Sequence, residues 1–578
     1  MIFQSLYRYY QRLAQTDGVD IPREGFAPQK ISFALELSPE GSVEEVIDLR
    51  VPEGKNGKLV PRIIILPALS KARTTDFTPY FLWDKTKFCL GADTGGKEKD
   101  IQGAFAAFTK LHKELLAEVN TPEAKSLLAF VNNWKPAKAP ELENWEDMVG
   151  SNIVFRVGGR FLHECPELLS LWPRNDTAKE KQGICLVTGQ RTAIAPLHSP
   201  IKGISGAQTS GASLSAFKIE AFSSFGKEKN LNAPVGKYAA FAYTTALNYL
   251  AQEQSQSVRF GKTTVLCWAE KEHPLEQGLI NLIMGGEEKE ARVDVSTAQE
   301  RASLLRSLAQ GKNWQGSVPS ISLDTSLYVL GLVPNDARLA VTFFLQGTAE
   351  EFLEKIGAYY RELNISRYET DTEFPSVWQL ARAMLAPQKK MADIARMGGD
   401  LLQSILGGYV YPAYALPAVL ARLQAGENIN AVRAGLIKAI LIRNFNCEDN
   451  MKLNPSHPSQ AYHLGRVFAL LYSLQRKAIP GINAGIRERY YGAASTTPAL
   501  VFPLLLGNAQ NHIKKAKAGL YDKMITEIIS NHIEEFPKHF SQQEQGEFAL
   551  GFYHQRVNPD SQKADSDAIT PISENEED

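Results

Sequence analysis

The segment 201–250 is the part of the chain richest in groups that could bind a ligand. Gly203, Gly206 and Gly211 lack a Cβ, so the backbone there can approach a ligand closely. In a nucleic-acid groove, Gln and Asn side chains match adenine edges, and Lys matches guanine edges. The pattern predicts a loop that contacts bases, but a plain surface loop followed by an amphipathic helix would have the same composition. The candidate residues are Lys202, Gln208, Thr209, Ser210, Lys218, Asn230 and Asn232.

A second group of candidates is basic and lies near the carboxyl end. Residues 451–556 hold 12 Lys and Arg against 7 Asp and Glu, within a segment of helical periodicity. Basic stripes on a helical bundle suit a phosphate backbone, whose binding is electrostatic and independent of sequence. A solvated helix face would give the same pattern. The candidate phosphate contacts are Arg466, Arg487, Arg489, Lys514, Lys515 and Lys517.

Motifs for catalysis are weak. The sequence RFGKTT (259–264) does not complete the motif of a phosphate-binding loop, because Gln256 occupies the position of the required first glycine. The stretch from Gly203 to Ala207 misses the last glycine of a nucleophile elbow. The five cysteines lie far apart, and no histidine pair has metal-binding spacing, so we expect no metal, no cofactor and no enzyme activity. A nuclease would need clustered carboxylates, and the chain offers only adjacent pairs such as Glu44–Glu45.

The bulk composition is that of an ordinary folded protein. The chain has 578 residues, 44% hydrophobic and 22% charged, with 63 Lys and Arg against 64 Asp and Glu. This balance excludes a uniformly basic coating protein but leaves room for a local basic patch. The first residues do not form a signal peptide, and no apolar run approaches the ~20 residues of a membrane span. We therefore expect a reduced cytoplasmic protein with no membrane partner.

The elements that must position these groups change in character along the chain. Strand patterns cover 30–37, 43–51, 81–90, 152–157, 263–269, 326–332 and 338–345, with helices between them. After Pro375 only helical periodicity remains, in 377–386, 389–405, 415–425, 430–444, 460–478, 500–518, 523–535 and 542–555. The fold class predicted is α+β: a large mixed α/β N-terminal region, an all-helical C-terminal bundle and a disordered acidic tail. The domains predicted are 1–375, a helical connector 376–450, the bundle 451–557 and the tail 558–578.

Several short stretches resemble one known family over nearly the whole chain. They are YRYY (7–10), LWDKTKFCLG (82–91), CLVTG (185–189), IKG (201–203), QTSGASL (208–214), NAP (232–234), AYTTALN (242–248), LGR (464–466), RY (489–490) and GFYHQR (551–556). Together they resemble the large subunit of the type I-C CRISPR Cascade surveillance complex. The block around 185–250 carries the most specific part of this resemblance.

The resemblance implies a non-catalytic subunit in antiviral defence. Large subunits of this family lie at the crRNA 5′-handle end, which corresponds here to 1–375. They recognise the PAM in target double-stranded DNA, help to form the R-loop, hold the displaced single strand and recruit the helicase-nuclease. In RNA-guided systems the guide reads the target, and protein reads only the short PAM and the backbone. The implied partners are crRNA, target DNA, the Cascade backbone and crRNA-processing subunits, the small subunit and the helicase-nuclease.

Met451 is a candidate internal translation start. The resemblance also implies that the small subunit is made from within the large-subunit gene. A start at Met451 would precede a complete set of helices, and Glu448–Asp449 permits a ribosome-binding sequence just upstream. Met391 and Met397 are rivals that would begin in earlier helices. The alternatives to DNA recognition are a stand-alone nucleic-acid-processing enzyme (a nuclease) and a structural scaffold of the complex without DNA readout.

Overall fold

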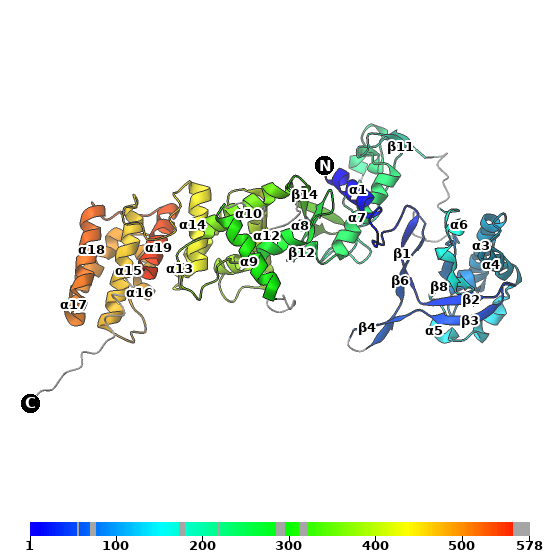
Figure 1. Ribbon diagram of the computed structural model, residues 1–578, viewed down its shortest axis with the longest axis horizontal. Coiled ribbons are helices and arrows are strands. Elements are labelled where there is room, and N and C mark those ends of the chain that lie inside the picture. Colours follow the sequence, from blue (N-terminus) through cyan, green and yellow to red (C-terminus); the bar gives the residue numbers. More distant parts are fainter. Residues whose placement is uncertain are drawn as a thin grey trace, which may run out of the picture. The chain divides into compact units, whose positions relative to one another are not determined.

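The chain forms two compact units (Figure 1). This computed structural model describes residues 1–54, 57–69, 77–172, 180–217, 220–284, 295–311 and 322–558. Unit 1 consists of Met1, Phe3–Ser199 and Ala216–Ala246, and unit 2 of Ile2, Pro200–Ser215 and Leu247–Asp578. About 49% of the chain is helix and 16% strand, with the sheets before the helical run, which confirms the α+β class. The chain passes from unit 1 to unit 2 between Ala246 and Leu247. The four-part division at 375, 450 and 557 stays a prediction.

The core of unit 1 is a five-stranded sheet. β2 (Phe33–Leu37) pairs antiparallel with β3 (Val43–Asp48) and parallel with β8 (Asn152–Val157). β7 (Trp83–Lys85) and β9 (Arg160–Phe161) both pair antiparallel with β8. Side chains alternate across the sheet, as the period of a strand requires. Phe33 and Phe155 therefore belong to one buried cluster, and Ala34 belongs to another.

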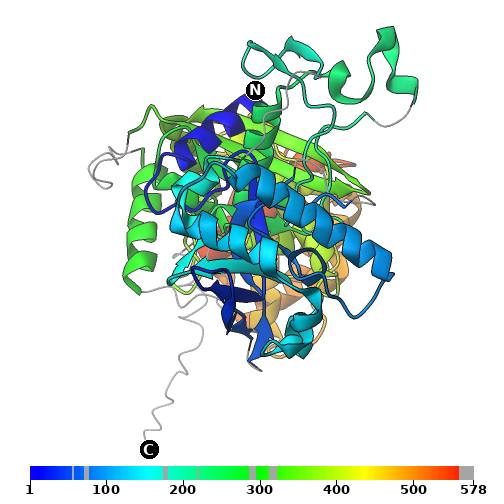
Figure 2. The same ribbon diagram turned by 90° about the vertical axis from the view of Figure 1, so that its right-hand side faces the viewer.

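Two helices cover one face of this sheet. α3 (Glu98–Leu116) and α4 (Pro122–Asn133) share the buried cluster of Phe33 and Phe155 through Phe108 and Phe130 (Figures 1 and 2). α4 begins at a conventional cap, because the Thr121 hydroxyl accepts a hydrogen bond from the N–H of Ala124.

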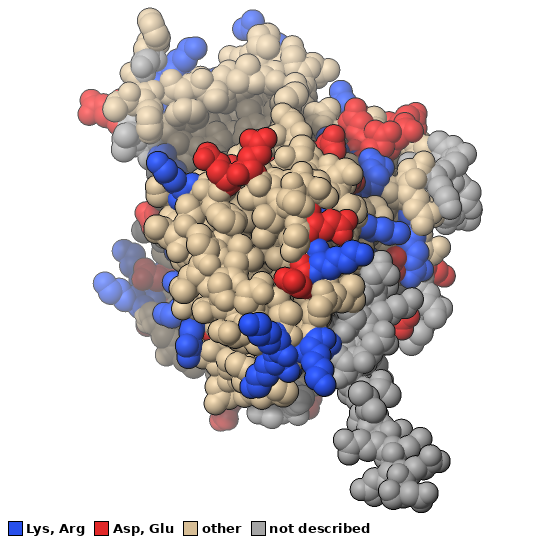
Figure 3. All heavy atoms as spheres, turned by 90° about the vertical axis from the view of Figure 1, so that its left-hand side faces the viewer, with Lys and Arg blue, Asp and Glu red and all other residues tan. Residues whose placement is uncertain are grey.

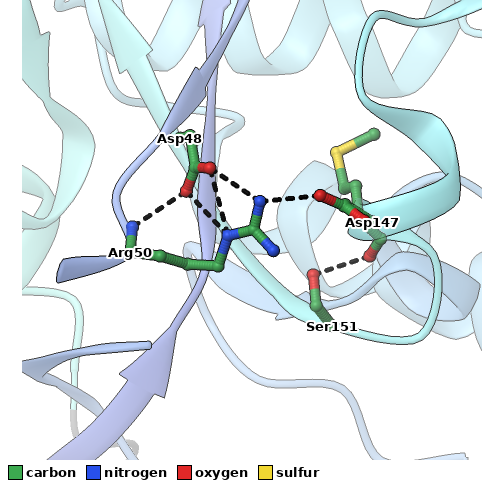
Figure 4. A network of polar contacts seen from close by, with 5 residues as sticks. Asp48, Arg50, Asp147 and Ser151 are labelled. Atoms are coloured by element: carbon green, nitrogen blue, oxygen red, sulfur yellow. Dashed lines mark hydrogen bonds and ion pairs between the residues drawn. The ribbon is translucent and has the colours of Figure 1, made fainter. Parts of the chain in front are cut away.

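An arginine ties the end of β3 to the segment before β8 (Figure 4). The Arg50 guanidinium donates to Asp48 and, at 2.8 Å, to Asp147 on α5 (Trp145–Met148). It also lies 4.8 Å from the centroid of the Phe33 ring. The Arg50 contact holds the pKa of Asp48 below its usual range. This network fixes the loop after β3, where the sequence predicted strand to Val51.

The remaining elements of unit 1 are short, apart from the helix at each end. The chain starts with α1 (Ile2–Leu13), and α7 (Lys237–Gln252) runs out of the unit. The others are β1 (Phe26–Ile31) paired with β6 (Arg62–Pro67), β4 (Val51–Glu53) paired with β5 (Lys58–Val60), β10 (Gln182–Ile184) paired with β11 (Arg191–Ala193), α2 (Thr86–Cys89), α6 (Pro166–Leu169) and five 3-10 turns.

Unit 2 begins with a four-stranded antiparallel sheet. Its order is β12 (Ser257–Phe260), β13 (Thr263–Ala269), β14 (Ser326–Asn335) and β15 (Arg338–Thr348). Lys262, from the RFGKTT stretch (259–264), lies in the turn between β12 and β13. Inward residues such as Val265 and Val329 join a single large core that continues into the helices. α8 (Leu275–Met284) and α10 (Ala349–Leu363) pack against this sheet, and α9 (Val295–Ala309) packs against α10.

The helical run that follows agrees with the sequence periodicity. Its members are α11 (Val377–Ala383), α12 (Met391–Gly407), α13 (Ala415–Gln424), α14 (Ala431–Phe445), α15 (Gln460–Ala478), α16 (Ile486–Ala494), α17 (Pro498–Ala516), α18 (Gly519–His532) and α19 (Gln542–Val557). The sequence did not predict α8 or α16. The prediction of a strand over 81–90 was wrong outside β7, because the chain bends at 81–82 and turns into α2 after Lys85. The acidic tail lies outside the described residues, apart from Asn558.

Candidate nucleic-acid interface

The glycine-rich segment forms a closed loop in unit 2. Ile201 and Ala212 exchange two backbone hydrogen bonds, of 2.8 and 2.9 Å, which bring the two ends of the loop together. Gly211 has φ +93°, and a Cβ there would lie 2.8 Å from the Cβ of Pro200. Only glycine fits this position, because the backbone conformation and the space both exclude a side chain. The closure leaves residues 208–210 at the tip of the loop.

The tip is exposed and its base is fixed. Gln208, Thr209 and Ser210 are all exposed. The carbonyl of Gln208 accepts a hydrogen bond from the N–H of Gly211 at 2.9 Å. At the base, the N–H of Lys202 donates to Oδ1 of Asn248 on α7 at 2.7 Å. The Lys202 side chain is exposed. The tip therefore presents an amide and two hydroxyls from a support that is held in place.

A second attachment joins the loop to the sheet of unit 2. The N–H of Ser213 donates to the carbonyl of Ala337, and the N–H of Leu339 donates to the carbonyl of Ser213, both at 3.0 Å. Ala337 lies in the turn between β14 and β15. This support was missing from the sequence prediction, because nothing in the local pattern links residues so far apart in the chain.

The other residues of the base-reading prediction lie outside this loop. Lys218 lies outside the described residues. Asn230 and Asn232 belong to unit 1, whereas the tip belongs to unit 2. Asn230 is fully buried, and the amide of Asn232 donates to the carbonyls of Lys227 and Lys229 at 3.1 and 3.0 Å. Asn232 therefore holds its own turn, and Asn230 is enclosed by the protein in this structure.

The basic residues of the bundle divide into exposed and buried groups. Arg489 on α16 and Lys514, Lys515 and Lys517 at the end of α17 are exposed. Figure 3 views the end formed by α17 and α18 and shows the basic side chains in several separate groups rather than one stripe. These four cations are free to meet a phosphate backbone.

The two buried arginines hold the bundle together. Arg466 is 8% exposed and donates to Oε1 of Gln555 at 3.0 Å and to Nδ1 of His463 at 3.1 Å. Burial lowers its pKa. Arg487, equally buried, donates to the carbonyl of Gly426 at 2.7 Å and to the side chain of Asn428. In this structure both guanidinium groups are engaged within the protein.

Met451 lies in the connection between α14 and α15. It is 39% exposed, and its carbonyl accepts from the N–H of Ser366 at 2.9 Å. A chain that began there would start outside any helix and would contain the complete helices α15–α19.

Two negative observations hold for the described ranges. No three His, Cys, Asp or Glu side chains are placed so that they could hold a metal ion. No helix there has the length and apolarity that crossing a membrane requires.

The comparison with known families identifies the class of protein that this loop and bundle belong to. No curated protein shows a significant match to the chain. The family model described as CRISPR-associated protein (Cas_Csd1) matches residues 6–558. The chain therefore belongs to this CRISPR-associated family, which confirms the resemblance to a Cascade large subunit.

Proposed function

We propose that this chain is the non-catalytic large subunit of a type I-C CRISPR Cascade complex and recognises the PAM in target duplex DNA. The observation that carries the proposal is the exposed tip of Gln208, Thr209 and Ser210 on a fixed loop. An amide and two hydroxyls can pair with base edges in a groove. A rigid support favours specificity, because little conformational freedom is lost on binding.

Exposed cations supply the sequence-independent part of DNA binding. Lys202 stands at the base of the loop, where a phosphate beside the PAM would pass. Lys514, Lys515 and Lys517 form an exposed group for the backbone of the displaced strand, and Arg489 is a further contact. Arg466 and Arg487 are left out of this part of the proposal because their guanidinium groups are buried and already bonded.

The other proposed roles concern partners. The subunit acts at the crRNA 5′-handle end, with the backbone and crRNA-processing subunits beside it, helps to open the duplex and recruits the helicase-nuclease. The small subunit is made by internal translation from Met451. The position of Met451 in a connection before α15–α19 supports this start over Met397, which is buried within α12.

A gel shift with the reconstituted complex tests base recognition. The target duplexes are identical except for the PAM-side flank, and each is titrated with complex that contains or lacks this chain. Binding should require both the chain and one flank sequence. Gln208→Ala with Ser210→Ala should reduce the preference for that flank, whereas Gln277→Ala on α8 should not. Equal binding of all flanks would refute PAM recognition and favour a scaffold without DNA readout.

A further inference from the structure

A polar cavity of about 480 Å³ lies within unit 2, where the last turns of α15 and α19 meet the first turn of α16. The segment between α13 and α14 closes another side of it. Its volume falls within the range of small-molecule sites, which is about 300–1,000 Å³. The wall contains three arginines and three tyrosines: Arg476, Arg487, Arg556, Tyr368, Tyr472 and Tyr553.

Both acidic side chains in the wall accept hydrogen bonds from backbone N–H groups of the same wall. The Asp371 carboxylate accepts from the N–H of Tyr368 at 3.1 Å, and the Glu488 carboxylate accepts from the N–H of Gly485 at 2.8 Å. Within the described ranges neither Arg476 nor Arg556 forms an ion pair with a carboxylate. The wall thus holds three arginines against two carboxylates, which leaves an excess of positive charge.

Two of these charges lie beside the ring of Tyr472. The guanidinium carbons of Arg476 and Arg556 lie 5.7 and 5.4 Å from the centroid of Tyr472. Nη1 of Arg476 also donates to the Tyr472 hydroxyl at 3.3 Å. Like charges repel unless an anion lies between them, and guanidinium groups match the geometry of phosphate oxygens. The arrangement is suited to a phosphate group.

The same wall offers flat faces to an aromatic ring. Tyr368 is 44% exposed at the cavity, and Tyr472 is half-buried. Nucleic-acid bases stack on tyrosine rings and on guanidinium planes, and this stacking tolerates any base. Bases inside a duplex are already stacked on their neighbours, so a cavity of this kind admits only an unpaired base.

We propose that this cavity binds one nucleotide of a single-stranded nucleic acid, with the phosphate between Arg476 and Arg556 and the base against the tyrosines. The site differs from the exposed cations of α16 and α17. It rests on the proposed function for the source of the strand, which a Cascade complex supplies as the displaced strand or the crRNA. Free nucleotides share this chemistry, and the experiment separates the two sources.

The test measures fluorescence anisotropy of a labelled dT10 oligonucleotide with the purified full-length chain. Arg476→Gln with Arg556→Gln should weaken binding about tenfold or more and make the salt slope shallower by about 0.7, which is the contribution of one single-strand phosphate contact. Ile482→Glu, which places a carboxylate in the cavity wall without removing an arginine, should also weaken binding. The matched control is Arg396→Gln, which should leave binding unchanged. Arg396 is an exposed arginine that also lies beside a tyrosine ring, 5.9 Å from the centroid of Tyr414, but it does not line the cavity.

Competition identifies the ligand. Unlabelled dT10 should displace the probe far better than dTMP, the matching duplex or inorganic phosphate. Displacement by phosphate as readily as by dT10 would show a simple anion site, and displacement by dTMP at the same concentration would show a free-nucleotide site. Either result overturns the proposal, as does dT10 binding that is equal in the double variant and in Arg396→Gln when circular dichroism shows both folded.

The outcome is distinguishable from failure of the proposed function. If the cavity proposal is wrong but PAM recognition is right, the double variant keeps both oligonucleotide binding and flank preference in the reconstituted complex. If PAM recognition is wrong but the cavity proposal is right, all flanks bind alike and oligonucleotide binding still depends on Arg476 and Arg556.

Discussion

Gly465 of α15 and Gly551 of α19 let the backbones of the two helices touch. A Cβ on Gly465 would lie 2.0 Å from the carbonyl oxygen of Phe548, and one on Gly551 would lie 1.9 Å from that of Tyr462. Real side chains do not approach so closely, so each glycine is required by the other helix. The stretches LGR (464–466) and GFYHQR (551–556), which carried the family resemblance near the carboxyl end, therefore mark the centre of the bundle.

Replacing either glycine should loosen this crossing. Gly465→Ala or Gly551→Ala forces the helices apart, and overpacking of this kind costs typically about 1–3 kcal/mol. Hydrogen exchange should become faster in α15 and α19. The control is Gly507→Ala on α17, where a Cβ meets nothing within 4 Å. That change should stabilise the helix by up to about 1 kcal/mol, because Ala favours helix over Gly. Unchanged exchange in the first two variants would contradict the close contact.

The fixed base of the recognition loop should matter for specificity. Asn248→Ala removes the acceptor of the Lys202 N–H without touching the tip. Because the tip then moves more freely, flank preference in the gel shift should fall severalfold while binding to non-specific DNA stays the same. Asn281→Ala on α8 removes an exposed amide that bonds only within its own helix and should leave the preference intact. Full flank preference in Asn248→Ala would show that this anchor does not set the position of the tip.

The exposed and buried cations of the bundle should behave differently on mutation. Lys514→Gln, Lys515→Gln and Lys517→Gln together should weaken DNA binding by the complex and reduce the dependence of affinity on salt, since fewer counterions are released. Arg466→Gln should instead lower the melting temperature, because it leaves His463 without its buried donor. Salt titrations and thermal melts of both variants check this. A lower melting temperature in the lysine variant, with unchanged salt dependence, would show that these lysines stabilise the fold and do not contact DNA.

The bundle should lose stability in mild acid. Nε2–H of His463 donates to the carbonyl of His457 at 2.7 Å, and Nδ1 accepts from Arg466. Burial lowers the pKa of His463 to about 4, and that of His554 to about 3. Below pH 6.5 the unfolded chain binds protons that the folded chain does not, so the free energy of unfolding falls as pH falls from about 6.5 toward 4.

Each buried histidine of this kind lowers the free energy of unfolding by up to about 1.4 kcal/mol for each pH unit of acidification within that window. Above the window it has no effect on the pH dependence. Chemical denaturation at a series of pH values measures the slope. His463→Gln should reduce this slope, although His554 still contributes to it, whereas His539→Gln, outside these bonds, should leave it unchanged. A slope that persists in full in His463→Gln would assign the acid sensitivity to other groups.

Met451 can be tested as an internal start without disturbing the fold. Replacing its codon with one for Leu keeps an apolar side chain of similar volume, so the full-length chain should remain stable. A short product that covers residues 451–578 should disappear from a gel. Met391→Leu serves as the matched control and should leave that product in place. A band of unchanged size in the Met451 variant would refute this start.

The sequence by itself determined the secondary structure of most of the chain and the character of the loop. Strand patterns placed β2 and β8, and helical spacing placed α10 to α15, because these patterns arise from residues close together in the chain. α8 and α16 were missed; α8 is buried over most of its surface, which removes the amphipathic signal, and α16 is short. Glycines followed by exposed polar residues indicated the loop, since that composition acts locally.

Only the tertiary structure decided which polar residues are available. Arg466 and Arg487 read as surface charges from spacing alone, yet contacts with Gln555 and Gly426 bury them. Asn230 is buried in the same way. Arg476 and Arg556 lie beside one ring although they are far apart in the chain, since α15 packs closely against α19. Whether a charged side chain faces solvent depends on residues far away in the chain. A local sequence pattern does not include those residues and therefore cannot predict its burial.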